Sequence, residues 1–163
     1  MLLGSKSAAS YTSNFLLFNF SVVMDNVELN QALITLVEKK MELGRLSYSD
    51  ASYDEVEEEL HDLEDAFVDK YGGYLESVFE GVHDKHCPDS DVLLPTAYMA
   101  NKYLKTGQKE DGSFEYDVAS YQEGVVVDSD DYDIARLVLI PNPTRIVLFA
   151  KDGNHRENVW EGN

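Results

Sequence analysis

The densest group of potential metal ligands in the chain consists of His83, His86 and Cys87. On a helix these residues are three and four positions apart, so their side chains would share one face. Zinc prefers three or four nitrogen or sulfur ligands in a tetrahedral array, and imidazole and thiolate are common among them. The sequence has no second Cys and His pair that would close such a site. The alternative is that the imidazoles stabilise the end of a helix and Cys87 is a small buried thiol.

Two Glu-x-x-His pairs, Glu58 with His61 and Glu80 with His83, resemble the carboxylate and imidazole pairs of di-iron helical bundles. Residues three apart share a helix face, so each pair could bind one metal ion. The pairs are 22 residues apart on one expected helix, which corresponds to roughly 33 Å at 1.5 Å per residue. They cannot share a site unless the chain folds back between them. We expect Glu58 and His61 to lie on a solvated acidic face.

Cys87 beside His86 also raises the question of a nucleophile and its base. Side chains of adjacent residues rarely face each other, and no third group that would orient this pair can be named. The C-terminal end of a helix raises the pKa of a thiol, because the helix dipole is negative there. A cysteine hydrolase is therefore not indicated.

The acidic segment 128–133 resembles the first half of a calcium-binding EF-hand loop. Such a loop needs Gly at its sixth position and Glu at its twelfth, where this chain has Asp133 and Leu139. We therefore expect an acidic turn between strands, with a loose calcium site as the alternative.

Acidic residues dominate the composition and give the chain a formal net charge of -18. Ten lie between Arg45 and Lys70 and nine between Lys109 and Arg136, and neither stretch contains a Lys or Arg. Such a field repels nucleic acids, anionic membranes and phosphate-rich substrates, and it attracts cations and basic proteins. We therefore expect no nucleic-acid partner, because phosphate contacts dominate such binding.

The charge favours a non-catalytic interaction protein with a basic protein partner, in analogy to small acidic α+β proteins that mimic DNA or neutralise a toxin. The alternative is a small divalent-metal-binding protein or enzyme that uses the cluster at positions 83, 86 and 87. In a simpler interpretation, the charge only keeps the domain soluble. The expected partner-binding residues share the exposed side of the second predicted helix and are Glu55, Glu58, Glu59, Asp62 and Asp65.

No known catalytic motif is present in the sequence. The chain lacks G-x-x-x-x-G-K-[ST], G-x-G-x-x-G, G-x-S-x-G and H-E-x-x-H. An enzymatic function is therefore not indicated, and we expect no cofactor.

Two helices are predicted before residue 88. Asp25 with Glu28 resembles a capping box at the start of the first, and Gly44 fits its end. Ser52 with Glu55 gives the same signal for the second helix, which we expect to be long and bent at Gly72-Gly73. Its apolar stripe has helical spacing and consists of Val56, Leu60, Leu63, Phe67, Tyr71, Leu75, Val78, Phe79 and Val82.

After Pro88 the apolar period changes to two, which is typical of strands. The connection 141–144 is too short for a crossover helix, so the strands that it joins must be antiparallel. Helices followed by strands indicate an α+β fold, in which a helical hairpin packs on an antiparallel meander sheet of about five strands. The predicted strands are 97–104, 113–118, 124–127, 134–140 and 145–150.

Residues 1–24 differ in composition from the rest of the chain. Residues 1–21 contain no Asp or Glu, one Lys, and the apolar run 15–20. We expect residues 1–24 to be an extension, disordered or not native, with Met24 as the natural start, and residues 25–163 to form one α+β domain. A signal peptide is the alternative, although the weakly charged start and the lack of an A-x-A site depart from that pattern.

Cys87 is the only cysteine, so an intramolecular disulfide cannot form. This fits a reducing compartment, and we expect a cytoplasmic protein. No stretch approaches the ~20 apolar residues needed to span a bilayer, so no membrane association is expected. The sequence gives no indication of the oligomeric state.

Overall fold

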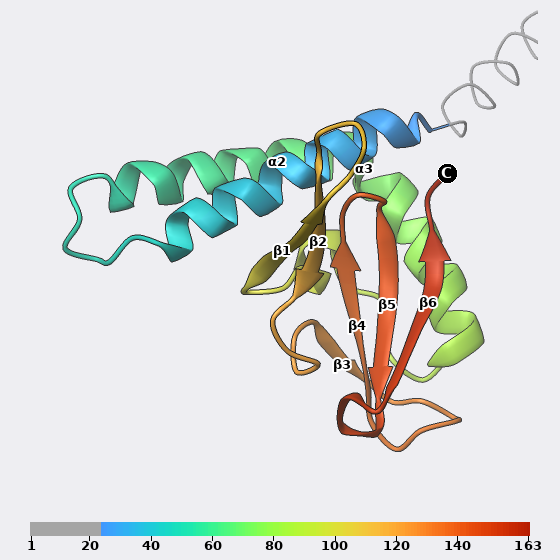
Figure 1. Ribbon diagram of the computed structural model, residues 1–163. Coiled ribbons are helices and arrows are strands. Elements are labelled where there is room, and N and C mark those ends of the chain that lie inside the picture. The colour runs from blue at the N-terminus through green and yellow to red at the C-terminus, as the bar shows by residue number, and fades with distance from the viewer. Residues whose placement is uncertain (1–23) are drawn as a thin grey trace, which may run out of the picture.

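The computed structural model describes residues 24–163, and the predictions for residues 1–23 fall outside this range. Two long helices are followed by six strands, which confirms the predicted α+β class (Figure 1). Among the described residues, no helix is both long enough and apolar enough to cross a membrane.

The first helix, α2, spans Asn26–Gly44 and begins and ends where the sequence predicts. The Asp25 carboxylate caps it by accepting hydrogen bonds from the backbone N–H groups of Val27 (3.0 Å) and Glu28 (3.3 Å). One face of α2 is buried against α3 and the sheet. The buried side chains on that face are Leu29, Leu33, Leu36 and Val37.

The second helix, α3, spans Tyr53–His86 and is unbroken at Gly72-Gly73. The predicted capping box at its start does not form, because the Ser52 side chain makes no capping hydrogen bond. Asp50 organises this turn instead: its carboxylate accepts from the Ser47 N–H at 2.7 Å, and its carbonyl accepts from the Tyr53 N–H at 3.1 Å. The predicted apolar stripe is buried along most of its length, but Leu63 and Val78 are only half-buried.

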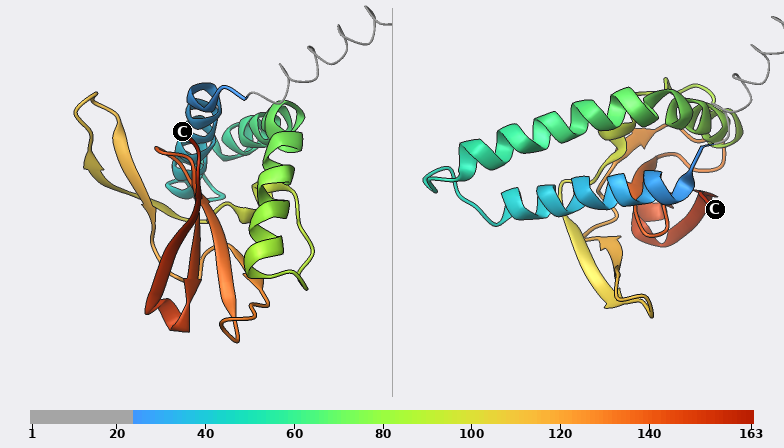
Figure 2. Two further views of the ribbon diagram at one scale, coloured as in Figure 1. Left: turned by 90° about the vertical axis from the view of Figure 1, so that its right-hand side faces the viewer. Right: turned by 90° about the horizontal axis from the view of Figure 1, so that it is seen from above.

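The two halves of α3 have different neighbours. The first half lies beside α2 and forms a helical hairpin with it, whose closed end at residues 45–52 projects away from the sheet (Figure 1). The second half lies against one face of the four-stranded sheet, as the left view of Figure 2 shows. The acidic first half is therefore held out from the strands, while the second half covers the core.

The strands form two antiparallel sheets rather than the single meander predicted from the sequence. One is a two-stranded hairpin, and the other is a four-stranded meander in chain order. The hairpin consists of β1 (Tyr103–Gln108) and β2 (Phe114–Val118), and the meander consists of β3 (Val125–Val127), β4 (Ala135–Ile140), β5 (Arg145–Ala150) and β6 (His155–Glu161).

The prediction of a strand at 97–104 is wrong over most of that range. A 3₁₀ turn, η1, occupies Pro95–Tyr98, and β1 begins only at Tyr103. Proline suits the first position of such a turn, and the turn directs Tyr98 into the core. There its ring stacks on Phe79 with the centroids 3.8 Å apart. The stacking of Tyr98 on α3 therefore favours a turn here, although the alternating apolar residues of this segment predict a strand.

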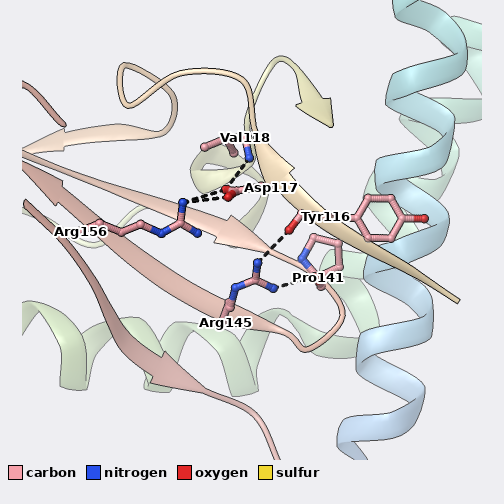
Figure 3. A network of polar contacts seen from close by, with 6 residues as sticks. All are labelled: Tyr116, Asp117, Val118, Pro141, Arg145 and Arg156. Atoms are coloured by element: carbon pink, nitrogen blue, oxygen red, sulfur yellow. Dashed lines mark hydrogen bonds and ion pairs between the residues drawn. The ribbon is translucent and has the colours of Figure 1, made fainter. Parts of the chain in front are cut away.

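Side-chain hydrogen bonds, rather than a backbone ladder, tie β2 to the four-stranded sheet (Figure 3). Arg145 of β5 donates to the carbonyls of Tyr116 (2.8 Å) and Pro141 (2.9 Å). Arg156 of β6 donates to both carboxylate oxygens of Asp117, at 2.9 and 3.1 Å. The hairpin consequently packs on the sheet face opposite α3, and β4 and β5 are buried at almost every position (Figure 2).

A polar junction joins α2 to the turn between β4 and β5. The Asn30 side-chain oxygen accepts from the Asn142 N–H at 2.7 Å and from the Thr144 hydroxyl at 3.1 Å. The Asn142 amide in turn donates to the Phe114 carbonyl at 2.6 Å, so the β1–β2 hairpin shares this junction. Asn142 and Thr144 are both buried, and their hydrogen bonds fix α2 at one end of the sheet.

Candidate interaction site

The acidic side of α3 is opposite the side that packs on α2. Val56, Leu60 and Phe67 face inward. At about 100° per residue, Glu58, Asp62 and Asp65 lie on the opposite side of the helix, where they are exposed. All of the predicted partner-binding residues are exposed, and these are Glu55, Glu58, Glu59, Asp62 and Asp65.

Glu59 differs from the other four residues because it is paired within the helical hairpin. Its carboxylate accepts from the Lys39 ammonium of α2 at 2.7 Å, and the same ammonium lies 2.9 Å from Glu42. The hydrogen bonds with Glu59 and Glu42 raise the pKa of Lys39. Glu59 therefore contributes to the contact between α2 and α3 as well as to the charge of the surface.

The remaining carboxylates form a longer row than the sequence reasoning assigned. Asp69 follows Asp65 by four positions and is also exposed, so it extends the same side of the helix. No Lys, Arg or His forms an ion pair with any member of this row within residues 24–163. We call this row the acidic ridge, and it consists of Glu55, Glu58, Asp62, Asp65 and Asp69.

His83, of the predicted metal cluster, is buried and uses both ring nitrogens. Its Nδ1 lies 2.8 Å from the Ser90 carbonyl and its Nε2 lies 2.8 Å from the Tyr98 hydroxyl. A carbonyl can only accept, so in the neutral ring Nδ1 carries the proton and Nε2 accepts from Tyr98. The Leu93 N–H donates to the same hydroxyl at 3.1 Å, which completes the chain of hydrogen bonds. Both ring nitrogens of His83 therefore have hydrogen-bond partners within the fold.

The other two cluster residues lie in different environments. His86 is half-buried at the last position of α3, while the Cys87 thiol is fully buried and free. Burial, with a smaller effect from the charge of Asp130, raises the pKa of Cys87 to about 11. A thiol of this kind is protonated near neutral pH, which does not suit a nucleophile.

The described residues contain no group of three or more His, Cys, Asp or Glu arranged to hold a metal ion. Within the Glu-x-x-His pairs, Glu58 and His61 are both exposed, whereas Glu80 is exposed and His83 is buried. Segment 128–133 is an irregular acidic connection between β3 and β4, where the Ser129 hydroxyl accepts from backbone N–H groups.

Comparison of the chain with protein-family models, with curated proteins and with solved structures finds no match. Geometry and charge are therefore the observations from which a role can be inferred. The acidic ridge presents anions along one exposed helix face, and its natural complement is a surface with cations at a similar spacing.

Proposed function

We propose that the protein is a non-catalytic interaction protein and that its acidic ridge binds a basic protein partner. The observation that carries this proposal is the row of exposed carboxylates from Glu55 to Asp69 without a paired cation in the described part of the chain. The row spans 15 residues of helix, and the 14 steps between its ends correspond to roughly 21 Å at 1.5 Å per residue. A partner would need Lys or Arg side chains distributed over a similar length.

The spacing of the ridge carboxylates indicates that their charge does not serve to stabilise the helix. Carboxylates at spacings of three and four residues repel each other and destabilise an isolated helix by a few tenths of a kcal/mol per pair. Glu59 shows that a neighbouring helix can supply a cation to this helix. The ridge carboxylates form no such ion pair with residues 24–163, and a basic partner would relieve their repulsion.

The same charge disfavours nucleic acid as the partner, because phosphate groups would meet carboxylates. A cytoplasmic location is part of the proposal. It is supported by the single cysteine, whose thiol is free and buried at Cys87.

The test is capture of partners from a lysate of the source cells at low salt, followed by binding kinetics on each captured protein. The ridge variant carries Glu58→Gln, Asp62→Asn and Asp65→Asn, which remove three charges and keep the side-chain shapes. We expect it to lose the partner mainly through slower association, because long-range charge acts on the encounter rate. We also expect binding of the wild-type chain to weaken steeply with salt, since the Debye length falls to ~8 Å at 0.15 M.

A matched control carries Glu76→Gln, Glu80→Gln and Asp84→Asn, which remove the same charge from exposed positions in the second half of α3. This variant should bind as the wild type does. Equal loss in both variants would indicate attraction to net charge alone. Failure to retain a basic protein, or binding that persists unchanged at about 1 M salt, would contradict the proposal.

A further inference from the structure

A cleft lies where the C-terminal end of α2 meets the segment that leads into β1. It consists of two adjoining cavities of about 430 Å³ each, both of which are lined by Lys40, Gly44 and Asn101. Small-molecule sites usually have volumes of ~300–1,000 Å³. Each cavity is therefore large enough for part of a small organic ligand, and the three lining residues that they share place the cavities side by side.

The first cavity has an apolar and aromatic lining. Leu43 of α2 and Leu60 of α3 form one side, and the rings of Tyr48 and Tyr53 form another. These two rings are tilted against each other with centroids 4.8 Å apart. Tyrosines placed in this way bind flat or apolar groups and keep their hydroxyls in water.

The second cavity is cationic. Lys40, Arg45 and Lys102 line it, whereas no Asp or Glu of the described part of the chain lines either cavity. The chain contains 31 acidic residues and only 13 Lys and Arg, so this lining is opposite in charge to the chain as a whole. None of the three cations forms an ion pair with a described residue.

Three nearby carboxylates, Glu123, Asp50 and Glu38, have hydrogen-bond or ion-pair partners of their own. Glu123 accepts from the backbone N–H groups of Asn101 and Lys102. Asp50 accepts from the Ser47 N–H at 2.7 Å, and Glu38 lies 3.0 Å from the Lys105 ammonium. These bonds hold the rim of the cleft in place, and Glu38 is also close enough to Arg45 for their charges to attract each other.

From this geometry we propose that the cleft binds a small organic anion, with its apolar or aromatic part between Leu60 and the two tyrosines and its carboxylate or phosphate group among Lys40, Arg45 and Lys102. A guanidinium can donate two parallel hydrogen bonds to either anionic group, and the ammonium groups add charge. The cleft is separate from the acidic ridge, so this inference stands independently of the proposed protein partner.

Titration of the full chain with anilinonaphthalene sulfonate tests the site, because this aromatic anion becomes fluorescent in an apolar environment. We expect saturable binding to one site and weaker binding of phenylnaphthylamine, which has a similar apolar body without the anionic group. Lys40→Gln, Arg45→Gln and Lys102→Gln should each weaken binding of the anionic dye roughly tenfold, as expected for loss of one charged hydrogen bond. The uncharged dye should be affected little.

Lys85→Gln is the control, because it removes one exposed cation from the last turn of α3, far from the cleft in the chain. This variant should bind the anionic dye as the wild type does, and circular dichroism should confirm that every variant is folded. Displacement of the dye by naphthoate or by naphthyl phosphate would support the site and identify the preferred anionic group. The absence of saturable binding, equal weakening in Lys85→Gln, or no displacement by either competitor would overturn the proposal.

Discussion

Burial determines the chemistry of the cysteine and histidine that the sequence groups together at the end of α3. His83 closes a chain of hydrogen bonds from Ser90 to Tyr98, and Cys87 is enclosed with no exposed surface. The spacing of His83, His86 and Cys87 is compatible with a metal site. The helix α3 also ends where the sequence predicts. The sequence does not predict that Tyr98 is buried and hydrogen-bonded to His83, because the alternating apolar residues around Tyr98 indicate a strand.

The raised pKa of Cys87 leads to a prediction about its reactivity. Burial moves this pKa from an ordinary value of 9.0 to about 11, so the native chain has roughly 100-fold less thiolate at pH 8 than the unfolded chain. Iodoacetamide reacts with the thiolate, so native Cys87 should be alkylated at least that much more slowly. The measurement is the rate of mass increase with and without guanidinium at pH 8. Equal rates would show that Cys87 is accessible and ionised in the folded protein.

At the scale of the elements, both long helices could be predicted because their apolar residues recur at helical spacing. The strands 113–118, 134–140 and 145–150 were also close to their observed bounds, since β4 and β5 are buried on both faces and are nearly continuous in apolar residues. The strand β6 was missed because it is an edge strand with mostly exposed polar residues, which leaves no alternation to detect. The way the hairpin attaches to the sheet was not predicted, because it depends on side-chain hydrogen bonds from Arg145 and Arg156 rather than on a backbone ladder.

Gly124, at the start of β3, should not tolerate a side chain. Its φ of +90° disfavours other residues, and a Cβ at this position would lie 2.2 Å from the Leu137 carbonyl oxygen. We expect Gly124→Ala to lower the free energy of unfolding by at least ~1–3 kcal/mol, through backbone strain and displacement of β4. Denaturant titration measures this change.

Gly73 in α3 is the matched control, because an added Cβ would meet no atom within 4 Å. Gly73→Ala should raise the stability by ~0.5–1 kcal/mol, as expected for replacing an exposed helical glycine. If both substitutions had the same effect, the close contact between Gly124 and β4 would be refuted.

At the scale of the whole molecule, the sequence predicts features that lie within one helix, but not features that form where distant segments meet. Exposure of the acidic residues in α3 follows from the position of its apolar stripe, so it could be derived before the fold was known. The cationic cleft brings residues 40–60 next to residues 101–103, and only the tertiary fold creates that neighbourhood. Its three cations are scattered in the sequence and give no local signal.

The last prediction concerns the effect of the net charge of -18 on stability. Self-repulsion destabilises a compact chain with such an excess of one sign, and salt screens it. The Debye length falls from ~30 Å at 0.01 M to ~8 Å at 0.15 M salt, so the melting temperature should rise over this range. The variant with Glu58→Gln, Asp62→Asn and Asp65→Asn should melt higher than the wild type at low salt, because it loses three charges that form no ion pair within residues 24–163. The salt dependence of its melting temperature should also be smaller.

Glu59→Gln provides the comparison for this prediction. It also removes one negative charge from α3, but it breaks the 2.7 Å contact with Lys39, so relief of repulsion is offset by a lost attraction. Its melting temperature at low salt should therefore stay at or below that of the wild type. A rise for Glu59→Gln that equals the rise per charge in the ridge variant would mean that only the net charge matters. If the ridge variant instead melts lower than the wild type, these carboxylates stabilise the fold. In that case they do not repel each other enough to matter, and a basic partner would have no repulsion to relieve.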